Sequence, residues 1–380
     1  LKTSLTMPTF TLSICIPTHN GRCETLNALL SCVGEQCTGL ESTAVQVCVS
    51  DNASNDGTEA MISKLQADYP VPLTYFRFDQ DMRGVRNFLN VVDISDAEYC
   101  WLIGSDDMLP PQSVAKVLAN LREWPGLSGM TVNKLNFDKT LTILVGPDHD
   151  LVLPTHPNYT RPLYGIDIAD SLGISFTYMS SHIFHRDAWQ NVVDEFGRDR
   201  LCSTRHFPHT YIFLRIAEKS SQWYWLSDYC VIQRMDNFCI LDENENFLYE
   251  YADEFTHDLI QVWNLTDTPS IVKKNLLNRL YFIFWNPISI FVYLSDPRLS
   301  IRKQISMIRN SISRFGGLTK FWFFTFPILF MPTALCRALM HLLDLTDRWV
   351  PVRRLLHWLR SVIARWLSFL RAGSRSTEDT

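Results

Sequence analysis

Short apolar runs alternate with segments of helical periodicity in the first third of the chain. Runs of about four to eight apolar residues predict buried strands, and they cover residues 12–16, 45–50, 73–78 and 99–103. Apolar positions at helical spacing predict helices over 23–35, 57–68 and 85–92, and another after Pro110 and Pro111. This alternation predicts an α/β fold, in which helices wrap a parallel sheet and ligand binds at the carboxyl ends of the strands.

The pattern is mixed from residue 140 to about 235. Prolines at 154, 157 and 162 mark loops, and apolar runs over 174–184 and 223–232 predict two further strands. We expect this stretch to complete the same α/β domain and to cover its other side.

From Glu243 onward the periodicity is helical, and beyond Tyr281 the sequence is rich in aromatic residues. We therefore predict an α/β domain over 10–240, divided into halves 10–111 and 112–240. A helical C-terminal region follows over 241–375.

Charge separates these two regions. Residues 1–296 carry 21 Lys and Arg against 36 Asp and Glu, whereas residues 297–375 carry 14 basic residues against two acidic ones. The net charges are −15 and +12. A basic region on an acidic body predicts an anionic partner, for which phospholipid and nucleic acid are the candidates.

The ten cysteines are scattered, with no C-x-x-C pair and no Cys/His group at zinc spacing. They are typical of reduced, mostly buried thiols. This usage favours the cytosol over a secreted, disulfide-bonded scaffold.

Polar clusters follow three of the predicted strands. The first strand ends in PTHN (17–20), a cluster equally typical of a plain turn. The second runs into DNASNDGT (51–58), where Asp51 has the chemistry to accept hydrogen bonds from a base or a ribose, while 56–58 also suits a turn and helix N-cap. The fourth ends in GSDD (104–107), whose adjacent carboxylates repel unless a cation lies between them. An exposed acidic turn is the alternative for this last cluster.

The order of these motifs, with Asp81, Gly84 and Asn87 between the second and the last, resembles glycosyltransferase family 2. These are inverting enzymes with the GT-A fold that use nucleotide-diphospho-sugars. The resemblance covers residues 10–235 and is strongest up to Pro111.

The resemblance implies a role for each matching position. The nucleotide pocket would be lined by Pro17, Thr18 and Asn20. Asp51 would bind the base, supported by Asn52 and Ser54, and Arg83 or Arg86 would contact the diphosphate or the ribose.

The resemblance also implies a metal site and a closing loop. Asp107 would bind Mg2+ or Mn2+, and Asp106 would lie on the ribose or sugar side of the same metal region. Gln233 and Arg234, at the end of a strand, would clamp the diphosphate.

Two positions depart from the family pattern. Gly104 stands where the metal motif usually has its first Asp, which leaves fewer protein ligands for a metal. Counting back from Arg215 places Pro208 and His209 where the family has Glu and the catalytic Asp. His209 is therefore the candidate general base, because imidazole with a pKa near 6.5 is able to accept a proton from a hydroxyl.

The alternative for His209 is a structural role, as a helix cap or as a donor to a carbonyl. His182 and His206 are weaker candidates for the base. A histidine at this place, after the sequence SSHIFHR, is similar to the abequosyltransferase-like branch of the family.

The C-terminal region has the features of a membrane-contacting segment. The run FWFFTFPILFMPTALC (321–336) is too short to span a bilayer and is broken by two prolines, so we expect it to dip into the interface or to lie on it. A helix over about 351–371 has Trp, Leu and Ile on one side and Arg on the other, as an in-plane interfacial helix requires. A helical bundle or a homo-oligomer interface is the alternative, and nucleic-acid binding lacks a supporting fold.

These observations predict an inverting, metal-dependent hexosyl- or deoxyhexosyltransferase. It would act on a lipid-linked or glycan acceptor in surface polysaccharide or lipopolysaccharide biosynthesis, attached peripherally to the inner face of the cell membrane. The alternative is a non-catalytic nucleotide-sugar-binding scaffold of a membrane complex. Nucleotidyl transfer is disfavoured, because no Gly-rich phosphate loop with Lys or Arg is present.

Overall fold

The computed structural model describes residues 9–138, 140–144, 161–203, 207–219, 222–234 and 248–346. The chain divides into two compact units: residues 1–246 with 251–283, and residues 247–250 with 284–380. The boundary predicted at residue 240 lies outside the described residues.

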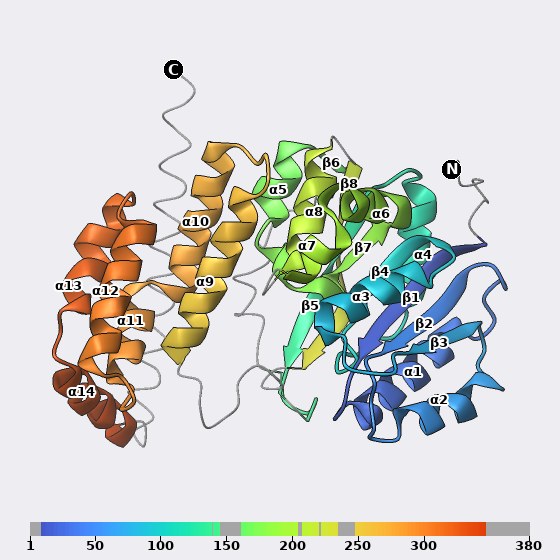
Figure 1. The fold of residues 1–380 in the computed structure, drawn as a ribbon, viewed down its shortest axis with the longest axis horizontal. Coiled ribbons are helices and arrows are strands. Elements are labelled where there is room, and N and C mark those ends of the chain that lie inside the picture. The colour runs from blue at the N-terminus through green and yellow to red at the C-terminus, as the bar shows by residue number, and fades with distance from the viewer. Residues whose placement is uncertain are drawn as a thin grey trace. The chain divides into compact units, whose positions relative to one another are not determined.

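An eight-stranded mixed sheet forms the centre of the first unit, in the order β3-β2-β1-β4-β7-β5-β8-β6 (Figure 1). The strands are β1 (Phe10–Thr18), β2 (Val45–Asp51), β3 (Leu73–Arg77), β4 (Ala97–Leu102), β5 (Gly129–Phe137), β6 (Leu163–Tyr164), β7 (His182–His185) and β8 (Gln222–Arg234). Strands β1 to β4 are parallel, and β7 pairs antiparallel with both β4 and β5. Since β8 runs parallel to β5, the carboxyl ends of β1, β2, β4, β5 and β8 all lie at one edge.

Helices cover both faces of this sheet. They are α1 (Cys23–Cys37), α2 (Thr58–Gln66), α3 (Arg83–Asp93), α4 (Ser113–Glu123), α5 (Ile166–Leu172), α6 (Arg186–Phe196), α7 (Arg198–Ser203) and α8 (Pro208–Glu218). Two further helices, α9 (Leu248–Asn264) and α10 (Ser270–Phe284), follow along the chain, and Asn275 of α10 donates to Asp170 of α5 at 3.0 Å. The four strands and four helices predicted up to α4 are confirmed, as is the strand predicted at 223–232.

Alternation along the strands explains this layering. Ile14, Val47 and Trp101 belong to a core shared with apolar residues of α1, α2 and α4. The next residues of these strands, Cys15 and Cys48 among them, face the other way and are equally buried. Strands buried on both faces are nearly continuous in apolar residues, which is why the sequence shows them as unbroken runs.

The strand predicted over 174–184 is wrong for most of its length. Residues Ser175–Thr177 and Met179–Ser181 form two 3-10 turns, and only β7 at its end is extended. The Ser175 hydroxyl donates to the carbonyl of Leu172 at 2.7 Å, and the Thr177 hydroxyl to that of Ile174 at 2.8 Å. Such local side-chain bonds favour turns over strands. We refer to residues 175–181 as the turn segment.

A buried polar chain ties the turn segment to the sheet. The Trp223 indole N–H donates to the Thr131 hydroxyl at 2.8 Å, and Thr131 Oγ1 lies 2.9 Å from Nδ1 of His182. His182 Nε2 lies 2.9 Å from the carbonyl of Ser175 and donates to it. Burial lowers the pKa of His182 to about 3. Both ring nitrogens are therefore engaged, and His182 is a structural residue.

The second unit contains α11 (Pro287–Ser295), α12 (Ile301–Phe315), the π-helical turn η4 (Phe321–Thr325), α13 (Phe326–Leu329) and α14 (Thr333–Thr346). In the described part of the chain, no single helix has the length and apolar character to cross a membrane. The helical segments 321–329 and 333–339 have the required length and apolar character only when they are taken together, and the chain bends by 96° between them. The helix predicted over 351–371 lies outside the described residues.

We predict that Gly129→Ala lowers the free energy of unfolding by about 1–3 kcal/mol. A methyl group at Gly129 would lie closer to three ring carbons of Trp223 than van der Waals contact allows, and the indole is held by its bond to Thr131. Chemical denaturation measures the change. Gly84→Ala is the control, because nothing lies within 4 Å of the methyl group it adds; equal stability of the two variants would contradict the packing argument.

Candidate active site

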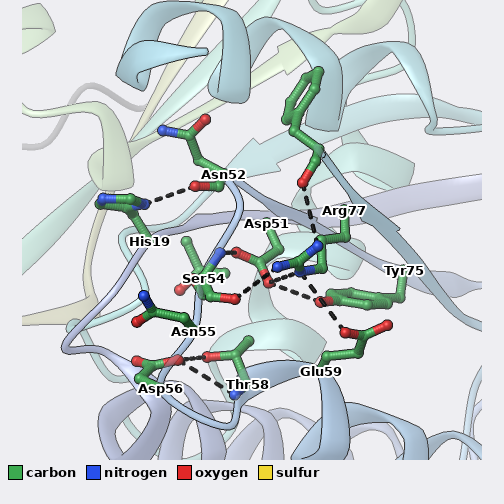
Figure 2. Close-up of polar contacts among 12 residues, drawn as sticks. His19, Asp51, Asn52, Ser54, Asn55, Asp56, Thr58, Glu59, Tyr75 and Arg77 are labelled. Carbon is green, nitrogen blue, oxygen red and sulfur yellow. Dashed lines mark hydrogen bonds and ion pairs between the residues drawn. The ribbon is translucent and has the colours of Figure 1, made fainter. Parts of the chain in front are cut away.

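Asp51 ends β2 and lies fully buried within a polar cluster (Figure 2). Its Oδ1 accepts a hydrogen bond from the Ser54 N–H at 2.9 Å, and its Oδ2 accepts one from the Tyr75 hydroxyl at 2.7 Å. The Arg77 Nε lies 3.9 Å from the same Oδ2. A buried carboxylate needs such partners, and here they fix the position of the side chain that we predict to bind the base.

Asn52 connects the loop after β2 to the turn that precedes α3. Its Oδ1 accepts from the Met82 N–H at 2.7 Å, and its Nδ2 donates to Asp81 at 2.5 Å. Asp81 also accepts the Arg83 N–H at 2.7 Å. Arg83 has a φ of +68°, a left-handed conformation that non-glycine residues rarely adopt. Asn52 therefore stabilises the strained turn that carries Arg83.

Asp56 joins the loop after β1 to the loop after β2. Its Oδ2 accepts from the N–H groups of Gly21 and Arg22 at 2.9 and 3.3 Å, and its Oδ1 from the Thr58 hydroxyl at 2.6 Å. Burial opposes ionisation of the carboxyl, but these hydrogen bonds outweigh it and lower the pKa of Asp56. The turn predicted as the structural alternative for 56–58 is thus present, and Asp56 holds the two loops together.

The loop after β1 carries the residues predicted to line the nucleotide pocket. Pro17 is partly buried, Thr18 is buried and Asn20 is exposed. The Thr18 carbonyl accepts from the Asn52 N–H at 3.0 Å and from Asn87 Nδ2 at 2.9 Å. Asn20 Oδ1 accepts from the Asn55 N–H at 2.7 Å.

Two buried hydroxyls in these loops keep unused hydrogen-bonding capacity. Thr18 Oγ1 and Ser54 Oγ have no hydrogen-bond partner within the described ranges. Buried polar atoms normally find a partner. Their position next to Asp51 is consistent with a bound ligand that supplies it.

Asp106 and Asp107 follow β4, at the same edge of the sheet. Asp106 forms an ion pair with Arg22 at 2.9 Å, and both side chains are partly buried. Because the backbone of Arg22 is itself held by Asp56, this ion pair connects the β4 loop with the loops that surround Asp51.

Asp107 is almost completely buried and is held by the turn segment. Its Oδ2 accepts from the Tyr178 hydroxyl at 2.7 Å and from the Ser180 hydroxyl at 2.6 Å, and its Oδ1 lies 3.4 Å from the Arg234 N–H. Burial, with the neighbouring charge of Asp106, raises the pKa of Asp107 to about 6. Burial and the charge of Asp107 raise the pKa of Tyr178 well above its ordinary value, so its hydroxyl stays protonated and donates.

The two carboxylates converge above Gly104. A Cβ at this position would lie 3.0 Å from Asp106 Oδ1 and 3.0 Å from Asp107 Oδ2. No cluster of three or more His, Cys, Asp or Glu side chains suited to a metal occurs in the parts of the chain that the structure describes. Two carboxylates nevertheless fit Mg2+ or Mn2+, because such ions are held by one or two carboxylates together with phosphate oxygens of the substrate.

Several residues that the sequence analysis did not select complete this site. Arg22, Tyr178 and Ser180 hold the two carboxylates, and Lys134 lies buried on β5 with its Nζ 4.4 Å from the centre of the Tyr178 ring. Lys134 also donates to Gln233. Only the charge of Arg22 and Lys134 was visible in the sequence, since their partners are distant along the chain.

Arg234 lies at the end of β8, the strand end at which the sequence placed it, and the other two arginines lie at the start of α3. Arg234 Nε donates to the carbonyl of Asp106 at 3.0 Å. Arg86 forms an ion pair with Asp199 at 2.8 Å. Arg83 and Arg86 both line a pocket of about 620 Å3 between the start of α3 and the end of α7.

His209 is partly buried in the first turn of α8. Its Nε2 lies 3.1 Å from the carbonyl of Thr177, in the turn segment, and donates to it. This is the carbonyl contact foreseen as the structural alternative, and it leaves Nδ1 as the nitrogen with a lone pair. Burial lowers the pKa of His209 to about 4, so the ring is neutral at pH 7. His206 lies outside the described residues.

Comparison with known proteins supports the predicted resemblance. The family model described as glycosyl transferase family 2 matches residues 13–200. Abequosyltransferase RfbV of Salmonella typhimurium is 30% identical over 233 residues, which are 60% of this chain and 67% of that protein.

Solved structures show the same fold. Residues 1–349 of S. aureus TarS align with a TM-score of 0.57 and 12% identity over 82% of each chain. The mannosyltransferase PcManGT of Pyrobaculum calidifontis, in complex with GDP-Man and Mn2+, aligns with a TM-score of 0.52 and 14% identity over 89% of each chain. The prediction of a GT-A fold for the α/β domain is confirmed.

We predict that Asp107→Asn removes a contribution to stability that falls as the pH rises from about 4 to 6, so the variant gains stability relative to the wild type across this window. The folded-state pKa of about 6 lies above the ordinary value of 3.8. At this carboxyl the folded protein therefore binds more protons than the unfolded chain in this window, and the contribution of Asp107 to stability falls as the pH rises through it. At pH 8 the variant should be more stable than the wild type, by on the order of 2 kcal/mol.

Denaturation at pH 4, 5, 6 and 8 measures this effect. Asp199→Asn is the control, because that carboxylate is 90% exposed and paired with Arg86, and no gain at pH 8 is expected. A less stable Asp107→Asn variant at pH 8 would show that ionised Asp107 stabilises the fold.

Proposed function

The chain belongs to glycosyltransferase family 2, and from this premise we propose that it transfers a hexosyl or deoxyhexosyl group from a nucleotide-diphospho-sugar with inversion at the anomeric carbon. The acceptor is a lipid-linked or glycan hydroxyl at the cytosolic face of a membrane, in surface polysaccharide assembly. One observation carries the proposal: buried Asp51 and the Asp106–Asp107 pair lie at the carboxyl ends of strands in one sheet, and Arg22 bridges their loops.

The loops after β1 and β2 suit a nucleoside. Asp51 uses each carboxylate oxygen for one hydrogen bond, and an oxygen has capacity for a second. The unused hydroxyls of Thr18 and Ser54 lie in the same loops. In the proposed complex Asp51 binds the base, and these hydroxyls complete their hydrogen bonding on the ligand.

The β4 loop suits the diphosphate. Asp106 and Asp107 would hold Mg2+ or Mn2+, which when bound would neutralise charge on the leaving nucleoside diphosphate. The Arg234 side chain is fixed to the Asp106 backbone at 3.0 Å. Arg234 thus places a cation beside the carboxylates, where it would bind a phosphate oxygen. The mannosyltransferase complex with GDP-Man and Mn2+ supports a donor and metal of this class.

His209 is the proposed general base. Its Nε2–H is committed to Thr177, which fixes the tautomer and leaves Nδ1 to take the proton of the acceptor hydroxyl. The low pKa keeps Nδ1 free of a proton at neutral pH. Because a base of low pKa accepts a proton only as the acceptor oxygen becomes acidic, proton transfer accompanies attack on the anomeric carbon.

We predict that His209→Ala and His209→Gln both lower kcat by about 10^2 to 10^4. Gln restores a donor for the Thr177 carbonyl but offers no basic nitrogen. Transfer to acceptor is measured on purified protein with matched unfolding temperatures. Recovery of activity in His209→Gln alone would assign His209 to positioning, and near wild-type turnover in both variants would remove it from the mechanism. Protonation of His209 should not lower the wild-type kcat between pH 8 and about pH 5, because the pKa of His209 is about 4 and the ring stays neutral over this range.

The same proposal places the chain on a membrane. The positive charge of residues 297–375 would meet anionic headgroups, and the concentration of Trp and Phe in this region suits the lipid interface. A lipid-linked acceptor would then be presented near the site. A homo-oligomer built through this region is the competing arrangement.

We predict that one class of nucleotide-diphospho-sugar raises the unfolding temperature, and that its transfer needs Mg2+ or Mn2+. The panel contains UDP-, dTDP-, GDP- and CDP-sugars, since a ligand that binds only the folded state stabilises it. EDTA should abolish transfer and added Mn2+ restore it, and NMR of the product should show the inverted anomer. Binding without turnover of any donor would favour the non-catalytic scaffold, and a retained anomer would refute single displacement.

A further inference from the structure

The second unit exposes a row of aromatic side chains on η4, α13 and the residues that follow. Trp322, Phe326 and Phe330 are spaced four residues apart, with successive ring centroids 4.7 and 5.0 Å apart. Phe323 and Phe324 beside them are 73% and 62% exposed. We call these five residues the aromatic ridge. Trp322, Phe323 and Phe324 are consecutive in the sequence and all exposed. Phe326 links Trp322 to the exposed Phe330 by ring contacts, so the ridge differs from the single apolar residues that are common on protein surfaces.

We propose that the aromatic ridge inserts into the interfacial layer of an anionic lipid bilayer and is the membrane contact of this chain. The inference deepens the proposed function, on which it rests for the membrane location of the acceptor. It assigns the contact to described residues, independently of the helix predicted at 351–371.

Polar groups within the ridge are already satisfied inside the protein. The indole N–H of Trp322 donates to the carbonyl of Gly316 at 2.7 Å. The hydroxyl of Thr325, between Phe324 and Phe326, donates to the carbonyl of Trp285 at 3.2 Å. Insertion into lipid would therefore not strip these groups of a water partner, which is the main cost of placing polar atoms in an apolar layer.

The backbone carbonyls at the helix interruption between α13 and α14 also have partners inside the protein. Leu329 and Met331 lie at the break before α14, and both of their carbonyls accept from Gln304 Nε2 of α12, at 3.0 and 3.3 Å. Irregular backbone is tolerated at membrane depth only when its polar groups have partners in the protein. The 96° bend between 321–329 and 333–339 suits shallow entry into one leaflet.

Charge favours a lipid surface over a second copy of the chain. The described residues of the second unit carry seven Lys and Arg against three acidic residues (Glu250, Asp296 and Asp344), an excess of four positive charges. Arg298 and Lys303 pair with Asp296 and Glu250. A symmetric dimer through this unit would bring its excess positive charge together. Anionic headgroups have the complementary sign, and Trp and Phe beside Lys and Arg are typical of interfacial segments.

Vesicle flotation of the full chain tests the proposal. The ridge variant is Phe323→Ser/Phe324→Ser. The control is Leu265→Ser/Ile271→Ser, which removes exposed apolar side chains (43% and 62%) from the first unit. With vesicles of phosphatidylcholine and phosphatidylglycerol, the wild type and the control should float. The partition coefficient of the ridge variant should be lower by a factor of roughly ten or more. Vesicles of phosphatidylcholine alone should bind the wild type more weakly.

The outcomes separate this inference from the proposed function. Unchanged flotation of the ridge variant overturns the inference, as does gel filtration in which the wild type is a dimer and the ridge variant a monomer that still floats. Donor hydrolysis in vesicle-free solution should be equal in wild type and ridge variant. If the wild type floats, the ridge variant does not, and no donor is turned over by either, the proposed enzyme fails while the membrane contact stands.

Discussion

The burial of Asp107 beside Asp106 is the constraint on which the rest of the site depends. Two adjacent carboxylates at a strand end are costly in a protein interior, and the raised pKa of Asp107 expresses that cost. The surrounding structure compensates for it from several directions: Arg22 pairs with Asp106, while Tyr178 and Ser180 donate to Asp107. Both of these hydroxyls come from the turn segment. The hydrogen bonds that run from Trp223 through Thr131 to His182 hold the turn segment in place.

The turn segment also presents the Thr177 carbonyl to His209. One short stretch of the polypeptide therefore positions both the proposed metal ligand Asp107 and the proposed base His209.

The sequence predicted the parts of the fold that depend on local pattern. Strands β1, β2 and β4 are largely apolar and buried on both sides, so their runs are visible without any partner. The positions of Asp51, Asp106 and Asp107 then follow from the ends of these strands. The turn segment was misassigned because its apolar residues resemble a strand, whereas serine and threonine hydroxyls that bond to nearby carbonyls decide its shape. Tyr178, Ser180 and Lys134 were missed for a different reason. Tyr178 and Ser180 lie more than seventy residues from Asp107, and Lys134 gains its role only when β5 is placed between β7 and β8.

Gly104 shows how a departure from the family pattern is built into the geometry. The two carboxylates occupy the space that a side chain at this position would need, each 3.0 Å from the missing Cβ. The backbone N–H of Gly104 donates to the Ser180 hydroxyl at 3.0 Å, and that hydroxyl donates in turn to Asp107. The glycine thus takes part in holding Asp107 through its backbone, where the usual aspartate would add a third charge. In the proposed complex, a site with only these two carboxylates would depend more on phosphate oxygens of the donor to hold a cation than a site with three carboxylates would.

The buried histidines and the buried aspartate oppose each other in their effect on stability. His182 and His209 have pKa values of about 3 and 4 in the folded protein, below the ordinary 6.5. Between these values the unfolded chain binds protons at the two histidines and the folded protein does not. The free energy of unfolding therefore falls as the pH drops below about 6.5. Asp107 has the reverse sign, since its folded-state pKa lies above the ordinary value and it favours the folded protein at low pH. Their windows overlap between about pH 4 and 6, where the contributions partly cancel. Above pH 6 the histidines contribute little further change, and the ionised Asp107 remains a net cost that the hydrogen bonds from Tyr178 and Ser180 offset only in part. A cation bound at the β4 loop, as proposed above, would remove this cost, so burial of Asp107 would favour metal binding there at neutral pH.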